Sequence, residues 1–269
     1  MVEEKNSIEG RKQRAVQSVE VGGRILLALA NSREAMNLRD LSAMAGMAAS
    51  RAHSYLVSYV RLGLIVQDSS GRYDLGPAAL QIGLACLQRL DPLKVAEPII
   101  QDLATRTGHT VAIAVWGNFG PTVVRLIEAK GPLHISLRIG SVLSIFDTAT
   151  GRAFASVLAK DKLAQAVAGP LGELLGRQEF KKRLVDLEKI KEEAREHGLS
   201  RVEGRPIPGV NAFSAPVFDF EGNPVFVVTV TDNQDRLKSS WNSPTVALIK
   251  NAVAQISDSI GGSNANKLE

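Results

Sequence analysis

The hydrophobic residues between positions 19 and 76 recur first at the spacing of helices and then at the spacing of strands. Three blocks with apolar residues three and four apart predict helices over residues 19–30, 38–45 and 48–61. Two short apolar runs, 64–67 and 72–75, flank a turn that contains Gly71 and predict a β-hairpin. Three short helices followed by a hairpin are the pattern of a winged helix-turn-helix, which we predict for residues 14–76.

Local signals give the expected boundaries of these helices. Ser18 is expected to cap the first helix, with Val19 as the first residue of its apolar face. Asn37 is expected to cap the second helix, and Asp40, three residues later, completes a short form of the capping box. Gly46 suits the tight turn between the second and third helices.

The third predicted helix carries small polar residues and one arginine on the face opposite its apolar stripe. Arg51 suits a contact with base edges, because a guanidinium can donate two hydrogen bonds to guanine, and the small Ser50 and Ser54 let the backbone approach DNA closely. The predicted DNA-binding residues are Arg39, Ser50, Arg51, His53, Ser54 and Arg72. Arg39, His53 and Arg72 are assigned to the DNA backbone, although His53 also fits a position inside the domain. On pattern alone, a packing module or a protein–protein adapter fits as well.

A further helical segment, residues 77–92, is predicted to link two domains. Pro77 suits its first turn, and Leu80, Leu84 and Leu87 lie on one side of it. Cys86 lies beside them and is expected to be a small buried hydrophobe. Because it is the single cysteine of the chain, an internal disulfide is excluded.

Residues 93–262 alternate between strand-like and helix-like segments and predict an α+β domain with an antiparallel sheet. The expected strands are 110–116, 121–129 and 134–139, which form a meander, and 211–218 and 225–231, which form a hairpin. The expected helices are 95–106, 148–159, 161–168, 178–198 and 244–260. The polar terminal segments 1–13 and 263–269 are expected to be disordered.

The loop of residues 140–153 is the best candidate for a ligand site. It places Ser144, Asp147, Thr148 and Thr150 among apolar residues just before a predicted helix. The free N–H groups and the dipole at the start of that helix suit a carboxylate. A loop in which the threonines only cap the helix fits the same pattern.

The sequence lacks the common motifs of metal binding, phosphate binding and catalysis. Its four histidines fall in no metal-ligand spacing, and it has no Cys-x-x-Cys, phosphate loop, Gly-x-Gly-x-x-Gly or Gly-x-Ser-x-Gly motif. We therefore predict no metal, no cofactor and no catalytic residue, and we do not expect an enzyme. No apolar run approaches the roughly 20 residues of a membrane span, and the polar first residues are no signal peptide, so we expect a cytoplasmic protein.

The charge of the chain leans toward its first third. The first 90 residues hold 11 Lys and Arg against 8 Asp and Glu, whereas the remainder holds 21 against 20. This small excess agrees with a phosphate-bearing partner for the N-terminal domain.

Residues 17–83 also resemble the DNA-binding domain of IclR-type transcriptional regulators. The matching motifs are Ser18-Val19-Glu20, Asp40-Leu41-Ser42, Leu62-Gly63 and Gly71-Arg72-Tyr73. The resemblance continues through Thr148-Ala149-Thr150-Gly151-Arg152-Ala153, Gly209-Val210-Asn211-Ala212, Ala215-Pro216-Val217 and Thr229-Val230-Thr231. It implies a regulator that binds a pseudo-palindromic double-stranded DNA operator as a homodimer or a dimer of dimers, with the apolar side of residues 77–92 against another subunit.

The resemblance further implies that the second domain is a GAF/profilin-like effector-binding domain for a small organic acid. It assigns to the effector site the residues Leu143, Ser144, Phe146, Asp147, Thr148, Ala149, Gly151, Glu203, Ala212, Thr229 and Thr231. Binding of the acid is expected to shift the placement of the DNA-binding domains through residues 77–92.

The chain departs from the family pattern at both predicted sites. The recognition helix begins Ala48-Ala49-Ser50-Arg51 where the family has Pro-Lys-Ser-Thr, and Ser54 replaces an arginine, so we expect an altered operator preference. In the second domain Ser144 replaces a proline and Ala212 a cysteine, so the ligand need not be one of the family's small keto acids.

Three aromatic residues extend this hypothesis. Phe146, Phe213 and Trp116 are expected to line an enlarged pocket that tolerates an aromatic acid. The alternative is that they are core residues, which is favoured for Trp116. The main alternative for the whole chain is a metabolite-binding protein or an enzyme that retains the helix-turn-helix for dimerisation.

Overall fold

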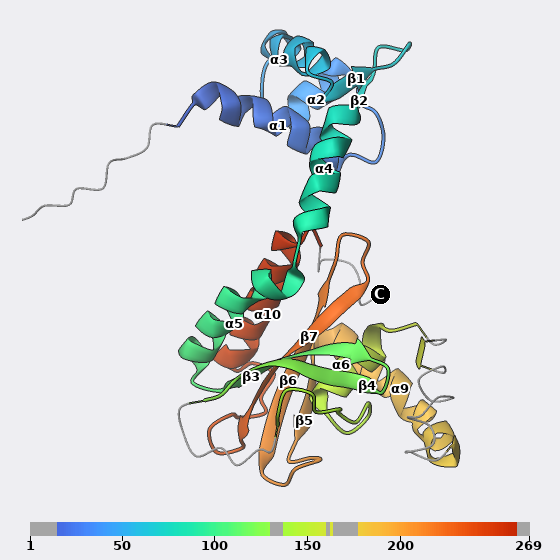
Figure 1. The fold of residues 1–269 in the computed structure, drawn as a ribbon, viewed down its shortest axis with the longest axis vertical. Coiled ribbons are helices and arrows are strands. Elements are labelled where there is room, and N and C mark those ends of the chain that lie inside the picture. Colours follow the sequence, from blue (N-terminus) through green and yellow to red (C-terminus); the bar gives the residue numbers. More distant parts are fainter. Residues whose placement is uncertain (1–14, 130–136, 160–161, 164–176, 263–269) are drawn as a thin grey trace, which may run out of the picture. The chain divides into compact units, whose positions relative to one another are not determined.

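The computed structural model describes residues 15–129, 137–159, 162–163 and 177–262, with the backbone alone for 177–185. The chain divides into two compact units, Met1–Leu90 and Asp91–Glu269 (Figure 1). Several predicted segments lie outside the described residues: the tails 1–13 and 263–269, residues 134–136 of the expected third strand, and most of the expected helix 161–168.

The described part of the first unit contains three helices, a two-stranded antiparallel hairpin and a fourth helix (Figure 1). In chain order they are α1 (Gln17–Asn31), α2 (Leu38–Met44), α3 (Ala49–Arg61), β1 (Ile65–Gln67), β2 (Tyr73–Leu75) and α4 (Pro77–Arg89). This order confirms the predicted winged helix-turn-helix.

The turn from α2 to α3 forms as its sequence predicts. The Asn37 Oδ1 accepts a hydrogen bond from the Asp40 backbone N–H at 2.9 Å, and the Asn37 amide donates to the Asp40 carboxylate at 2.8 Å. Gly46 has a φ of 66°, which is easily adopted only by glycine. Buried Leu41 and Leu56 then pack the two helices into one core, which also includes Tyr73 of the hairpin.

Three predictions for the first unit are wrong. Helix α1 begins at Gln17, so Ser18 lies inside the helix and caps nothing, and Val19 is 70% exposed. The buried face of α1 instead starts at Val21, and Val19, two residues earlier, points to the other side of the helix. Cys86 of α4 is exposed rather than buried.

The second unit is built on a five-stranded antiparallel sheet in the order β4-β3-β7-β6-β5. The strands are β3 (Thr110–Gly117), β4 (Gly120–Ile127), β5 (Ser200–Glu203), β6 (Val210–Phe218) and β7 (Pro224–Asn233). The helices in the described part are α5 (Pro92–Thr107), α6 (Ala149–Val157), α9 (Arg177–His197) and α10 (Pro244–Ser259). The predicted α+β domain with an antiparallel sheet is therefore confirmed.

Helices cover both faces of this sheet (Figure 1). Helices α5 and α10 pack together on one face, and α6 and α9 lie on the other. Strand β6 is consequently buried along nearly its whole length. The expected meander is only partly right, because β3 pairs with β4 and β7, and the described residues 137–139 form no strand. The short edge strand β5 is absent from the sequence-based expectation.

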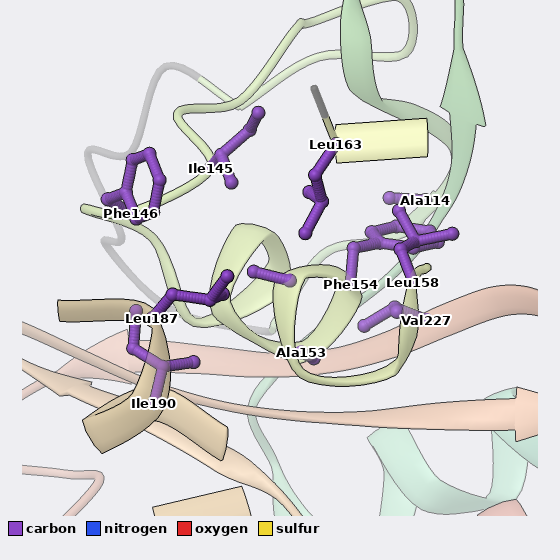
Figure 2. Close-up of a cluster of buried hydrophobic side chains, with 11 residues drawn as sticks. Ala114, Ile145, Phe146, Ala153, Phe154, Leu158, Leu163, Leu187, Ile190 and Val227 are labelled. Carbon is purple, nitrogen blue, oxygen red and sulfur yellow. The ribbon is translucent and has the colours of Figure 1, made fainter. Parts of the chain in front are cut away.

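The loop before α6 is anchored in the core of the second unit. Figure 2 shows Ile145 and Phe146 of this loop in one cluster with Phe154 of α6 and with Leu187 and Ile190 of α9. Ile145 is fully buried and Phe146 is 4% exposed. The backbone that leads into α6 is therefore held by apolar packing.

Candidate DNA-binding face and ligand cavity

The outer face of α3 displays the residues predicted to read DNA bases. Ser50, Arg51 and Ser54 are all exposed. The Ser54 hydroxyl lies 3.5 Å from the Ser50 carbonyl oxygen, one turn earlier in the helix. Among the described residues, the Arg51 guanidinium has no hydrogen-bond or ion-pair partner, so all its N–H donors are open to an incoming ligand.

The residues predicted to contact the DNA backbone lie in α2, in α3 and in the turn before β2. Arg39 is exposed on α2, and His53 is exposed on α3, so the alternative of an interior position for His53 is wrong. The Arg72 guanidinium donates to the Ala35 carbonyl at 3.3 Å and remains exposed. All three side chains are therefore accessible to a partner such as a phosphate group.

The turn of the β1–β2 hairpin is held by one carboxylate. The Asp68 Oδ1 accepts from the Ser70 hydroxyl at 2.7 Å and from the backbone N–H groups of Ser70 and Arg72, each at 2.9 Å. These bonds, that from the Ser70 hydroxyl first, lower the pKa of Asp68 below its ordinary 3.8. The ionised carboxylate of Asp68 therefore stabilises the turn of the hairpin through these three hydrogen bonds.

Helix α4 exposes large apolar side chains. Leu80, Ile82, Leu84 and Leu87 are 64%, 62%, 49% and 41% exposed, and the helix buries no residue in its own unit. Exposed apolar patches of this kind mark interaction surfaces. No helix in the described part of the chain is long and apolar enough to cross a membrane.

The second unit contains a cavity of about 120 Å³ between the start of α6, the strands β5 to β7 and the segment that joins β5 to β6. Its wall is formed by Leu137, Leu143, Thr148, Ala149, Thr150, Val202, Arg205, Pro206, Ile207, Val210, Ala212, Thr229 and Thr231. The predicted effector residues Leu143, Thr148, Ala149, Ala212, Thr229 and Thr231 are thus brought together. Sequence reasoning missed the segment with Arg205, and it placed Thr150 in the candidate loop but not in the site.

Most hydroxyls of the wall are already hydrogen-bonded to protein. Thr148 caps α6, because its Oγ1 accepts from the Gly151 N–H at 3.0 Å and donates to the Ser144 carbonyl at 2.6 Å. The Thr231 hydroxyl donates to the Asn211 carbonyl at 3.0 Å. These two hydroxyls therefore hold the wall together and have no proton left for a ligand.

The remaining predicted effector residues lie elsewhere. Ser144 and Asp147 form a hydrogen bond with each other at 2.8 Å, and Phe146 lies in the core (Figure 2). Gly151 is buried in the first turn of α6. Glu203 pairs with Arg201 at 3.0 Å and lines a second, more open cavity of about 670 Å³. The structure does not bring these five residues to the 120 Å³ cavity.

The expected aromatic lining is also absent from the described wall of the cavity. Phe213 follows Ala212, which lines the cavity, so its side chain points to the other face of the sheet, where it contacts Trp241 at a ring distance of 5.8 Å. Trp116 packs on Phe154 at 5.5 Å and belongs to the core, as the alternative interpretation had it. The hypothesis of a pocket enlarged by these rings is therefore wrong.

No group of three or more His, Cys, Asp or Glu that could hold a metal ion occurs among the residues that the structure describes. One buried histidine and one buried carboxylate do form a pair: His109 Nδ1 lies 2.7 Å from Asp232 Oδ2. The Arg236 guanidinium lies 3.2 Å from the same carboxylate oxygen. This group joins the start of β3 to the end of β7 and is explained by that structural role.

Two family models match the chain. The IclR helix-turn-helix domain matches residues 18–69, and the bacterial transcriptional regulator IclR C-terminal region matches residues 84–258. Among curated proteins, the HTH-type transcriptional repressor AllR of Escherichia coli strain K12 is 24% identical over 254 residues, which are 93% of this chain and 92% of AllR.

Solved structures of similar proteins agree with these matches. The crystal structure of Pseudomonas aeruginosa HmgR is 35% identical, with a TM-score of 0.82 over 92% of this chain and 99% of HmgR. The Agobacterium tumefaciens repressor BlcR is 19% identical, with a TM-score of 0.73 over 92% of this chain and 98% of BlcR, and so shares the fold.

Proposed function

The chain belongs to the IclR family of bacterial transcriptional regulators, and on that premise we propose that it binds a pseudo-palindromic DNA operator under the control of a small organic acid. The observation that carries the DNA-binding part is the exposed, unpaired Arg51 at the start of α3, between the small residues Ser50 and Ser54. Two such helices in a dimer enter successive major grooves, where each arginine grips a guanine. Arg39, His53 and Arg72 bind phosphates beside them.

The dimer is proposed from the apolar face of α4. Leu80, Leu84 and Leu87 lie on one side of this helix and are not covered by the described residues of their own unit. A second copy of the helix can cover these side chains, because a two-fold symmetric dimer brings the same surface of both subunits together. Dimers of dimers follow where two operators lie close together. Such a regulator works in the bacterial cytoplasm, where its DNA is.

The control by ligand is proposed from the 120 Å³ cavity of the second unit. A cavity of about 150 Å³ holds one benzene molecule, so this smaller cavity suits a compact acid without an aromatic ring. The acid acts by binding one arrangement of the DNA-binding domains more tightly than the other, which shifts their populations. Because AllR and BlcR are named repressors, we propose that this chain represses and that the acid releases the operator.

The test is fluorescence anisotropy of the full-length protein on labelled fragments of its own upstream region, across a salt series. We expect tight binding to one fragment, with an affinity that falls steeply as salt rises. Arg51→Glu should weaken this binding at least about thirtyfold, since each bidentate contact to guanine contributes about 1–3 kcal/mol and the dimer carries the change twice.

The matched control is Lys250→Glu, which makes the same change of charge at an exposed position of α10. It should bind the operator like the unmodified protein. Normal operator binding by Arg51→Glu would show that α3 is not the recognition helix. Weak binding of the unmodified protein to every fragment would instead favour the metabolite-binding alternative. The enzyme form of that alternative has no support, because the matching families and the named relatives are transcriptional regulators.

A further inference from the structure

Three buried hydroxyls form a chain that ends at the cavity. The Ser214 Oγ lies 2.7 Å from the Thr229 Oγ1, which lies 2.8 Å from the Thr150 Oγ1. All three residues are buried, with exposed fractions of 0%, 5% and 3%. Among the described residues these hydroxyls have no other hydrogen-bond partner, and Thr150 and Thr229 line the cavity whereas Ser214 does not.

The direction of this chain follows from counting protons. Three hydroxyls carry three protons, and the two hydrogen bonds between them use two. If Thr150 donated to Thr229 and Thr229 to Ser214, the unused proton would lie on Ser214, fully buried with no acceptor, which is costly. If Ser214 donates to Thr229 and Thr229 to Thr150, the unused proton lies on Thr150, at the cavity. In a third arrangement Ser214 and Thr150 both donate to Thr229, and the unused proton lies on Thr229, which also lines the cavity. The second direction is favoured over this one, because hydroxyls that donate in sequence polarise and strengthen one another. It presents the Thr150 hydroxyl as a directed donor to whatever occupies the cavity.

One charged residue also lines the mostly apolar cavity. Arg205 is the only charged residue in the described wall, it is exposed, and no carboxylate or carbonyl of the described residues pairs with it. A guanidinium binds a carboxylate with two parallel hydrogen bonds. The wall thus holds a hydroxyl donor, Thr150, and an unpaired cation, Arg205. A matching ligand supplies a carboxylate for the cation and a further acceptor oxygen for the hydroxyl.

We propose that Arg205 and Thr150 are the residues that determine the specificity of the cavity. Arg205 binds the carboxylate of a compact monocarboxylic acid, and Thr150 donates to a second, acceptor oxygen of the same molecule. Ser214 and Thr229 are positioning residues that direct the Thr150 proton. This inference rests on the proposed function, because it gives the chemistry by which the effector is recognised.

Three probe molecules of matched shape test it on the full-length protein by isothermal titration calorimetry. Methoxyacetate has both features, butyrate replaces its ether oxygen by a methylene, and methoxyacetamide replaces its carboxylate by a neutral amide. We expect methoxyacetate to bind about tenfold more tightly than either of the others, which is the scale of one hydrogen bond to a charged or buried group.

The variants separate the two roles. Arg205→Gln should abolish the preference for methoxyacetate over methoxyacetamide. Thr150→Val should abolish the preference for methoxyacetate over butyrate while the Kd of butyrate stays unchanged, and Thr150→Ser should restore the preference. Ser214→Ala, which does not touch the cavity, should reduce the ether preference without changing butyrate binding, a result that a merely structural role would not give. Arg106→Gln, an exposed arginine paired with Asp102 on α5, is the control and should behave like the unmodified protein.

The inference is overturned if Arg205→Gln still prefers the acid tenfold, if Thr150→Val still prefers the ether, or if no probe binds at all. None of these results touches the operator assay with Arg51→Glu, so a failure of the proposed regulatory function is seen separately.

Discussion

The two candidate sites are built in opposite ways. Helix α3 displays Ser50, Arg51 and Ser54 on an exposed face, where Arg51 is unpaired among the described residues. The second unit encloses a cavity whose buried hydroxyls, such as those of Thr150 and Thr229, are bonded to one another. One site offers open donors to a large partner, and the other fixes a few donors around a small space.

This difference decides what each site tolerates. An exposed helix face needs only a folded helix behind it, so small shifts of the core leave its side chains usable. A cavity of about 120 Å³ is bounded by the start of α6, the β5–β6 segment and β7, and a small displacement of any of them changes its shape. Substitutions at buried positions should therefore affect the two sites unequally.

The largest effect is expected for Gly151→Ala in the second unit. A Cβ at this position would lie 2.1 Å from the Ser144 carbonyl oxygen and 2.5 Å from the Ile145 Cα, both backbone atoms that cannot rotate away. The loop and α6 would have to separate, at a cost of about 4 kcal/mol. Thermal unfolding should show the transition of the second unit at a much lower temperature, with loss of ligand binding and an unchanged transition of the first unit.

The control for this substitution lies in the other unit. Gly23→Ala places its Cβ on α1, where no atom lies within 4 Å, so it should be neutral or should stabilise by up to about 1 kcal/mol. A wild-type unfolding temperature for Gly151→Ala would break the comparison, because the cavity wall would then tolerate backbone displacement.

The next largest effect is expected for Leu56→Ala in the first unit. Leu56 is 1% exposed in the core of the helix-turn-helix, and its truncation should cost about 3 kcal/mol. Operator affinity should fall in proportion to the unfolded fraction of this unit, whereas calorimetric ligand binding by the second unit should remain.

Val57→Ala is the matched control in the same helix. Val57 is 39% exposed and should cost no more than about 0.5 kcal/mol. If Leu56→Ala weakened operator binding without any change in unfolding temperature, Leu56 would be acting on the recognition face directly rather than through stability.

The same contrast explains how much the sequence predicts. The first unit follows from local patterns, because its elements are short, consecutive and bounded by residues such as Asn37 and Gly46 that fix their own surroundings. Ser18 and Val19 were misplaced because α1 starts two residues earlier than its apolar pattern indicates. The exposed residues of α3 were predictable because they lie opposite an apolar stripe.

The cavity was predictable only in part. Thr148, Ala149, Thr229 and Thr231 carry a recognisable motif, but Arg205 lies in a segment with no periodic pattern. Strand β6 is buried on both faces, so no alternation of polar and apolar residues reveals that Ala212 faces the cavity while Phe213 faces the opposite side of the sheet, against Trp241. Which side of a fully buried strand meets which helix is decided by packing between distant segments.

A smaller effect is expected for Asn37→Ala, which removes the cap of α2. The bond from the Asp40 N–H at 2.9 Å is lost, at a cost of about 1 kcal/mol. Denaturant unfolding of the first unit should show this decrease, and Asn37→Ser, which retains a capping oxygen, should recover most of it. An equal loss for both variants would mean that the Asn37 amide bond to Asp40, and not the cap, is what stabilises α2.

The smallest effect is expected for pH at the exposed tip of the hairpin. Hydrogen bonds from Ser70 and Arg72 lower the pKa of Asp68 in the folded state below 3.8. A group with a lowered folded pKa stabilises the fold above its unfolded pKa and loses this contribution as the pH falls through the folded pKa. The urea midpoint of the first unit should therefore decrease below pH 3.8 in the unmodified protein by more than in Asp68→Asn.

The shift of the titration can be observed directly at the tip. The amide signals of Ser70 and Arg72, whose N–H groups bind the Asp68 carboxylate, should move together with a midpoint below 3.8 in an NMR titration. Because Asp68 is exposed, water competes for its charge and the effect on stability stays small. A midpoint at or above 3.8 would mean that the tip is open in solution, and the first unit would then present only α3, and not an ordered hairpin, to DNA.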